Sequence, residues 1–219
     1  MNTIHHHPED ETLSAYAAGA LPAALALVVG CHLEFCARCR GVVAQDEEIG
    51  GALIEGLTPP PPGAAARAEM LARLDSEPAA STAPAASATA APASSAMPRK
   101  LRGLMGDEAL EARPWRSAGP GVRMLSLNCG EGNALLLDIA PGHAVPEHSH
   151  RGTELTLILK GDYDDSLGHF GCGDVADLDG RIEHQPKAGA QGCLCLAGLD
   201  GPLRYKGWLP RLLQPFFPL

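Results

Sequence analysis

Two short stretches of the chain carry most of the side chains that bind metal ions in proteins. The first, HLEFCARC at residues 32–39, contains His32, Cys36 and Cys39. If this stretch is helical, the three side chains lie within roughly 60° of one another on one face. Two thiolates and an imidazole are three ligands of a tetrahedral zinc site. The histidine run at residues 5–7 offers the fourth.

The second stretch, GHAVPEHSHRGTELTLILKG at residues 142–161, contains His148, His150 and Glu154. The two histidines share one face of an extended strand, and Glu154 keeps the same parity across a short turn. His184, in GRIEHQP, comes later in the chain, where a neighbouring strand can close the site. Three imidazoles and a carboxylate suit zinc, iron, manganese or nickel, and the sequence does not choose among these metals.

Each stretch also has an interpretation without metal. Cys36 and Cys39 are then small buried hydrophobic residues, His32 is a hydrogen-bonded core histidine, and the second set lines a polar pocket. Zinc is the better prediction for the first stretch, because a small helical core needs reinforcement and structural zinc contributes on the order of 10 kcal/mol to folding. Cys31 points away from the ligand face and is expected in the core.

The elements that position these residues divide the chain into two parts. Residues 1–77 contain four stretches with helical patterns and punctuation, which predict a small helical domain. Residues 78–98 are almost entirely Ala, Pro, Ser and Thr and predict a flexible linker. Residues 99–219 contain short apolar runs, NALLLDIAPG, ELTLILKGDYDD, GCLCLAG and PLRYKGW, which predict an antiparallel β barrel or sandwich.

Charge and composition exclude several classes of protein. The 219-residue chain has a net charge of −9, and residues 1–60 hold eight acidic side chains against two basic ones. This charge repels nucleic acid, so we expect neither direct DNA binding nor a DNA-binding zinc module. The stretch 13–30 is short, rich in alanine and broken by Pro22, so it predicts no membrane span. The start of the chain lacks signal-peptide features, so we expect a cytoplasmic protein whose cysteines bind metal rather than form disulfides.

The second stretch resembles the first motif of the cupin superfamily at every glycine, histidine and glutamate. The second cupin motif matches at Gly173 and His184, whereas Asp179 and Arg181 stand where proline and glycine are usual. The pattern of His32, Cys36 and Cys39, with a histidine upstream and AYAAGAL between, resembles the zinc-binding anti-sigma domain. With the closing LPRLLQPFF, the whole chain is similar to the ChrR-type anti-sigma factors.

This resemblance implies a two-domain α + β protein: a zinc-stapled four-helix anti-sigma domain, a flexible linker and a cupin (jelly-roll) barrel. It implies a regulator that sequesters an extracytoplasmic-function sigma factor in a 1:1 complex and releases it under oxidative stress from singlet oxygen or organic peroxide. The alternative is a dioxygenase-like cupin metalloenzyme with a zinc-stapled interaction domain. The acidic charge of residues 1–60 is complementary to the basic faces of a DNA-binding partner.

The resemblance also assigns ligands to two sites. His7 is preferred to His6, because its distance to Tyr16 fits the family pattern. The implied structural zinc ligands are His7, His32, Cys36 and Cys39, and the ligands of zinc or another divalent metal in the cupin domain are His148, His150, Glu154 and His184.

Cysteines outside these sets are the candidates for redox chemistry. Cys193 and Cys195 in GCLCLAG share a strand face, and ChrR-type proteins carry a similar C-x-C pair. The alternative is two buried strand cysteines. Cys129 and Cys172 are expected to be structural, and Glu183, beside His184, is expected to be a surface carboxylate rather than a partner of a metal ligand.

Overall fold

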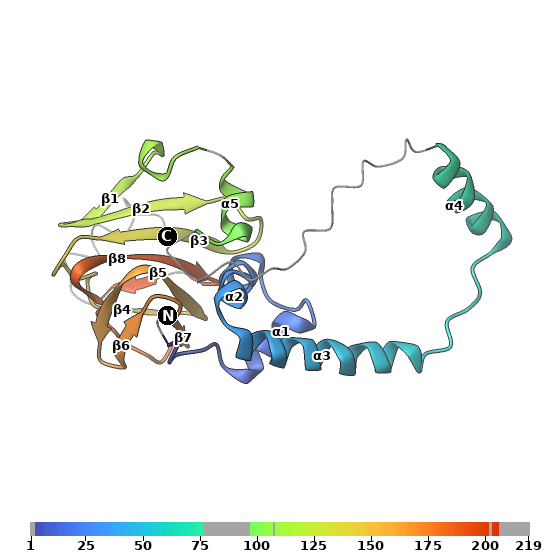
Figure 1. Ribbon diagram of the computed structural model, residues 1–219, viewed down its shortest axis with the longest axis horizontal. Helices are drawn as coiled ribbons and strands as arrows, with labels where there is room; N and C mark the ends of the chain where they lie inside the picture. Colours follow the sequence, from blue (N-terminus) through green and yellow to red (C-terminus); the bar gives the residue numbers. More distant parts are fainter. Residues whose placement is uncertain (1–2, 77–96, 107, 202, 206–219) are drawn as a thin grey trace. The chain divides into compact units, whose positions relative to one another are not determined.

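The computed structural model describes residues 3–76, 97–106, 108–201 and 203–205 (Figure 1). Almost all of the predicted linker at residues 78–98 lies outside these ranges, as does the closing LPRLLQPFF. Among the residues described, no helix is long and apolar enough to cross a membrane.

Helices occupy the first part of the chain, as the sequence predicts. They are α1 (Asp10–Ala17), α2 (Ala23–Phe35), α3 (Ala37–Glu55) and α4 (Ala64–Ser76), followed by α5 (Arg99–Met105) and a 3₁₀ turn at Leu110–Ala112. The expectation that residues 32–39 form a single helical face is wrong. Cys36 has extended backbone angles, φ −106° and ψ 109°, and separates α2 from α3. The metal-ligand stretch is therefore a corner between two helices.

Nine strands lie among the described residues of the second part of the chain. A seven-stranded antiparallel sheet has the order β1-β2-β3-β8-β5-β6, with β7 paired to β5, and β4 pairs with β9 in a small second sheet. The strands are β1 (Arg116–Gly119), β2 (Val122–Leu127), β3 (Asn133–Ile139), β4 (His148–His150), β5 (Glu154–Asp165), β6 (Gly168–Gly171), β7 (Val175–Leu178), β8 (Lys187–Leu199) and β9 (Leu203–Tyr205). The four apolar runs predicted as strands correspond to β3, β5, β8 and β9.

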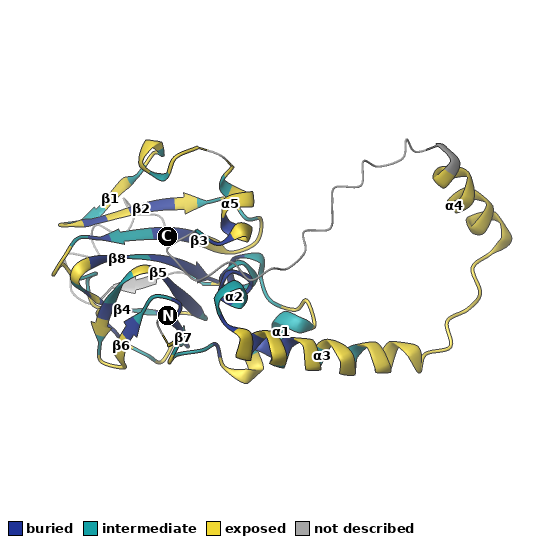
Figure 2. Cartoon of the chain, viewed as in Figure 1, coloured by how far each residue is buried: buried dark blue, intermediate teal, exposed yellow. Residues whose placement is uncertain are grey.

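Packing divides the chain into two compact units, residues 1–48 with 93–219, and residues 49–92. In the first unit α2 packs on β8, β5 and β3. A Cβ atom at Gly198 of β8 would lie 2.5 Å from the Ala24 carbonyl oxygen, so only glycine allows this close approach. Leu25 of α2 and Leu157 and Leu196 of the sheet belong to one buried cluster, and Figure 2 shows buried residues in both elements. Helix and sheet therefore share a core.

The ends of α2 are tied to the second part of the chain by hydrogen bonds. At its start, the Ala24 N–H donates to the Glu131 carbonyl oxygen at 3.0 Å. At its end, the Glu34 carboxylate accepts from the N–H groups of Arg99 and Lys100, at 2.8 and 2.9 Å, and so caps α5. These bonds hold the helix that carries His32 in one position on the sheet.

In the second unit, the residues of α4 whose burial is described are all exposed. The fourth predicted helix is present as α4, but its exposure means that packing of four helices into one bundle is not shown. The predicted boundaries, at 1–77, 78–98 and 99–219, stay predictions.

Candidate metal centres

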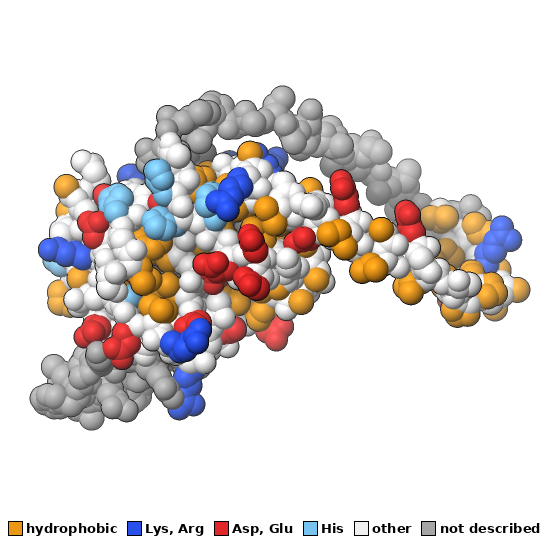
Figure 3. Space-filling view, turned by 90° about the horizontal axis from the view of Figure 1, so that it is seen from below, with side chains coloured by type: hydrophobic (Ala, Val, Ile, Leu, Met, Phe, Trp, Pro, Cys, Tyr) orange, Lys and Arg blue, Asp and Glu red, His pale blue; other side chains and the backbone are white. Residues whose placement is uncertain are grey.

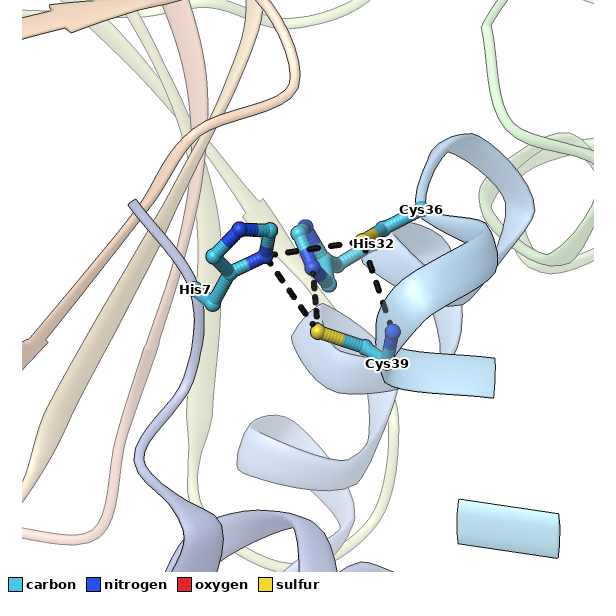
Figure 4. Close-up of side chains that lie close together, drawn as sticks. All are labelled: His7, His32, Cys36 and Cys39. Atoms are coloured by element: carbon cyan, nitrogen blue, oxygen red, sulfur yellow. Dashed lines mark hydrogen bonds between the residues drawn. The ribbon is translucent and has the colours of Figure 1, made fainter. Parts of the chain in front are cut away.

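The first predicted ligand set gathers at the corner between α2 and α3. His7 lies in the extended segment before α1, His32 is in the last turn of α2, Cys36 lies between the helices and Cys39 is in α3. Figure 4 shows the four side chains pointing toward one another from these separate segments. One ligand atom from each residue lies within 4.8 Å of all the others.

The distances in this set fit a zinc ion. His7 Nδ1 lies 3.4 Å from both the Cys36 and the Cys39 Sγ atoms, and His32 Nε2 lies 3.3 Å from Cys39 Sγ. Tetrahedral zinc with bonds of about 2.0–2.3 Å requires ligand atoms about 3.3–3.8 Å apart. Two nitrogens and two sulfurs are also a donor set of structural zinc sites. The residues present therefore fit zinc.

Hydrogen bonds and burial prepare His32 for coordination. Its Nδ1–H donates to the Gly173 carbonyl oxygen at 2.9 Å, which leaves the Nε2 lone pair directed at the cluster. Burial lowers the pKa of His32 to about 4, so the imidazole is neutral at neutral pH. Burial also raises the pKa of Cys39, because a buried thiolate is costly without a cation beside it. Zinc would supply that positive charge.

The second predicted ligand set gathers within the sheets. His148 and His150 are in β4, Glu154 begins β5, and His184 forms a backbone bridge with His148. Their ligand atoms also lie within 4.8 Å of one another, and all four residues are buried. The predicted shared face of residues 148 and 150, closed by His184 from an adjacent segment, is confirmed in the structure.

The orientation of these imidazoles fits a cation. His148 Nδ1–H donates to the Pro146 carbonyl oxygen at 2.7 Å, and His184 Nδ1–H donates to Asp165 Oδ2 at 3.3 Å. Their Nε2 lone pairs therefore face each other at 3.1 Å, and His150 Nε2 lies 3.3 Å from His184 Nε2. Converging lone pairs repel unless a cation lies between them.

The ionisation of this second set also favours a bound cation. Burial lowers the pKa of His148 to about 4, so this imidazole is neutral. Burial also opposes ionisation of Glu154, but the nearby histidines outweigh it and hold its pKa below the usual range. His150 Nδ1 makes no hydrogen bond within the described residues, although it lies 3.1 Å from Glu154 Oε2. Three imidazoles and a carboxylate are ligands that suit a divalent metal.

Sequence reasoning missed two residues that support this second set. Asp165 orients His184, and Thr156 Oγ1 donates to Glu154 Oε1 at 2.8 Å. Carboxylates and hydroxyls commonly orient metal ligands in this way. The available signal was parity, because Thr156 lies two residues after Glu154 on one strand. Asp165 lies at the far end of that strand, where spacing gave no indication.

A small cavity adjoins the second set. Its walls are mostly apolar, with Val122, Leu137 and Ile139 among them, and His148, Glu154 and His184 also line it. Tyr163 also lines the cavity, and its buried hydroxyl has no hydrogen-bond partner within the described residues. The second cluster therefore opens onto an apolar space with one unpaired donor.

The structure places the predicted redox pair in β8. Cys193 and Cys195 are both buried, and Cys195 lines the cavity. The neighbouring Cys193 thiol and burial raise the pKa of Cys195 well above its usual value, which disfavours the reactive thiolate. A redox role for this pair stays a prediction. Cys31 is fully buried and Glu183 is exposed, as expected.

Comparison of the sequence with family models gives two matches. Residues 10–40 match a model described as "Putative zinc-finger", which includes three of the first four ligands but not His7. Residues 108–202 match a model described as "ChrR Cupin-like domain", which includes all four ligands of the second set. The first match supports zinc binding by the helical part, and the second identifies the antiparallel sheets as a cupin fold.

Comparison with individual proteins gives a match along nearly the whole chain. The anti-sigma-E factor ChrR of Cereibacter sphaeroides is 42% identical over 222 residues, which cover 98% of this chain and 99% of the relative. A chain in the crystal structure of Rhodobacter sphaeroides SigE in complex with the anti-sigma ChrR superposes with a TM-score of 0.76. It is 38% identical and covers 90% of this chain and 100% of its own length.

Proposed function

The chain belongs to the family of the ChrR anti-sigma factors, and from this we propose that it sequesters an extracytoplasmic-function sigma factor in a 1:1 complex. The observation that carries the proposal is identity of 42% across both parts of the chain. Such identity over the full length makes the chain a regulator rather than an enzyme. The metalloenzyme alternative has no comparable support.

We assign the first cluster, His7, His32, Cys36 and Cys39, as the structural zinc site of the sigma-binding part. The distances between donors and the buried neutral imidazole of His32 support this assignment. Zinc held there joins the segment before α1 to α2 and α3. The cluster would therefore support the shape that binds the sigma factor.

Exposed apolar side chains offer a surface for the sigma factor. The second half of α3, the residues just after it and the helix α4 carry large hydrophobic residues at spacings of three and four. Hydrophobic side chains are visible on the molecular surface in Figure 3. A concentration of this kind marks interaction sites in soluble proteins. These side chains are at least half exposed: Ile49, Leu53, Ile54, Leu57, Met70, Leu71 and Leu74.

We further propose that the cupin domain senses the signal that releases the sigma factor. The second cluster, His148, His150, Glu154 and His184, would hold zinc or another divalent metal beside the apolar cavity. A bound metal would supply a Lewis-acidic position at which a small oxygen-containing molecule can bind. Singlet oxygen or an organic peroxide is the proposed inducer, and the cytoplasm is the proposed compartment.

The test of the primary proposal is reconstitution with purified components. The zinc-loaded full-length chain is mixed with an extracytoplasmic-function sigma factor of the same organism, and the mass of the complex is measured by light scattering. We expect one chain of each protein in the complex and loss of sigma-dependent transcription in vitro. If zinc-loaded protein forms no complex with any such sigma factor of its host, the proposal is wrong.

A further inference from the structure

The segment that carries His7 is bound to the turn between β6 and β7. The N–H groups of His5 and His6 both donate to Asp174 Oδ1, at 2.7 and 3.0 Å. The Val175 N–H donates back to the His6 carbonyl oxygen at 3.1 Å. The ring of His6 packs on Phe170, with centroids 4.2 Å apart. Residues 5 and 6 therefore have little freedom, and His7 follows directly.

The same turn also holds His32. The Gly173 carbonyl oxygen accepts the His32 Nδ1–H, and this bond determines which nitrogen faces the cysteines. Gly173 has φ +95°, and an added Cβ would lie 3.0 Å from the Ile4 side chain, so glycine is required here. Two of the four ligands of the first cluster thus depend on two consecutive residues of the cupin domain.

The turn itself is rigid. Asp174 is buried, and its second carboxylate oxygen, Oδ2, accepts from the Gly171 N–H at 2.9 Å. The Gly173 N–H donates to the Ile158 carbonyl oxygen at 2.9 Å, and the Ile158 N–H donates to the Asp174 carbonyl oxygen at 3.0 Å. Backbone donors to a carboxylate are charge-assisted and strong. Strand β5 thus fixes the turn against the sheet.

We propose that the cupin turn at Cys172, Gly173 and Asp174 positions the ligands of the first zinc site, so that the sensor domain controls how firmly the sigma-binding part retains its metal. Gly173 orients His32 through its carbonyl oxygen, and Asp174 fixes the backbone that presents His7. Neither residue binds the metal. The inference rests on the proposed assignment of His7, His32, Cys36 and Cys39 as ligands.

One strand gives this arrangement a route to the second cluster. Glu154, a ligand of the second cluster, begins β5, and Ile158 of the same strand holds the turn. A displacement of β5 at the cupin cluster would reach the turn through the two backbone hydrogen bonds of Ile158. It would then reach His32 through the Gly173 carbonyl oxygen. Hydrogen bonds and rigid elements of this kind can carry coupling between two sites.

Cobalt substitution tests the proposal in the full-length chain. Cobalt bound by Cys36 and Cys39 gives a thiolate-to-metal charge-transfer band, whereas the second cluster has no sulfur ligand and gives none. The rate at which this band disappears in excess EDTA measures retention at the first cluster alone. The measurement does not depend on sigma binding.

Two pairs of variants separate positioning from general damage. Asp174→Ala removes the carboxylate that accepts from the His5, His6 and Gly171 N–H groups. Asp164→Ala is its control, because Asp164 is an exposed carboxylate of β5 that contacts His169 instead. His5→Pro removes one N–H donor to Asp174 without altering the cupin domain, and His5→Ala keeps that donor. Asp174→Asn keeps Oδ1 as an acceptor and is the conservative variant.

Loss of a group that orients a ligand commonly costs about 10- to 100-fold in metal affinity. We therefore expect the band to disappear at least about tenfold faster in Asp174→Ala than in Asp164→Ala, and partial rescue in Asp174→Asn. His5→Pro should lose cobalt faster than His5→Ala. This second pair decides the matter if circular dichroism shows that Asp174→Ala is unfolded.

Equal rates within each folded pair overturn the positioning role. A wild-type protein that shows no charge-transfer band contradicts the ligand assignment itself. A normal band with no effect of the variants contradicts only the inference. The two failures are thus distinguishable.

Discussion

The two candidate metal sites differ in what holds their proposed ligands together. The first takes its ligands from an extended segment, a helix end, an interhelical corner and a second helix. In the second, His148 and His184 exchange two backbone hydrogen bonds of 3.1 Å, which join the two segments that carry them. The turn at residues 172–174 and the proposed zinc join the segments of the first site, whereas the backbone of the second is preformed. This contrast suggests a structural metal in one case and an exchangeable one in the other.

The largest effect on sigma binding is predicted for a variant that loses the first metal and keeps the second. Cys36→Ser with Cys39→Ser should weaken sigma binding at least about a hundredfold, because structural zinc supplies on the order of 10 kcal/mol of folding free energy. The matched double variant, His148→Ala with His150→Ala, should stay within about threefold of wild type, since a preformed sheet keeps its shape. Titration calorimetry with the sigma factor measures both. If the two double variants lose the same affinity for the sigma factor, the proposed difference between the clusters is wrong.

Much of the first cluster was predictable, since His32, Cys36 and Cys39 are close in sequence and ligand spacing is a local property. In the second cluster strand parity relates His148 and His150, and Glu154 follows after a short turn at the start of the next strand. The resemblance to a family supplied His7. Gly173 belongs to the cupin motif, but no local pattern relates Gly173 or Asp174 to the first cluster. They meet it only because α2 and the segment before α1 pack on the cupin domain.

The same packing explains the apolar character of α2. Its sequence, AALALVVGCHLEF, is almost entirely apolar up to its last turn, so apolar side chains lie on every side of the helix. Such a helix is either embedded in lipid or buried in protein. Here its residues Ala24, Leu25, Val28 and Val29 are all buried, and the helix contacts three strands and α5. Amphipathic periodicity therefore cannot assign its partners, and the predicted separation of helical and β parts did not foresee a shared core.

A cavity introduced into the shared core tests whether α2 and the sheet, which carry ligands of the two clusters, unfold as one unit. Leu25→Ala removes a nearly fully buried side chain of α2 and should lower the free energy of unfolding by about 2–5 kcal/mol. If helix and sheet unfold together, tryptophan fluorescence, to which Trp115 beside β1 contributes, and far-UV circular dichroism will report the same lowered midpoint in urea. Leu53→Ala, on the exposed part of α3, is the control and should stay within about 0.5 kcal/mol of wild type. If Leu25→Ala leaves the urea midpoint of the sheet unchanged, helix and sheet have independent cores.

A smaller effect is expected from a residue that orients a ligand of the second cluster without binding the metal itself. Asp165→Asn weakens the partner of His184 Nδ1 and should reduce metal affinity at this cluster by about 10- to 100-fold. Asp164→Asn alters the exposed neighbouring carboxylate and should leave that affinity unchanged. Competition with a chromophoric chelator measures both affinities. A preformed site predicts that Asp165→Asn leaves the fold intact, so any loss of sheet structure would contradict the contrast drawn above.

The smallest effect concerns the cavity beside the second cluster. Tyr163 presents a buried hydroxyl that has no partner among the described residues, and an unsatisfied group of this kind costs about 1–3 kcal/mol. Tyr163→Phe should therefore raise the free energy of unfolding by about 1 kcal/mol at unchanged m-value, measured in urea on metal-free protein. A decrease would mean that the hydroxyl is satisfied by bound water. If an oxygen-containing inducer binds there, the variant gains stability but responds less to that inducer, because the Tyr163 hydroxyl is the donor that the cavity offers it.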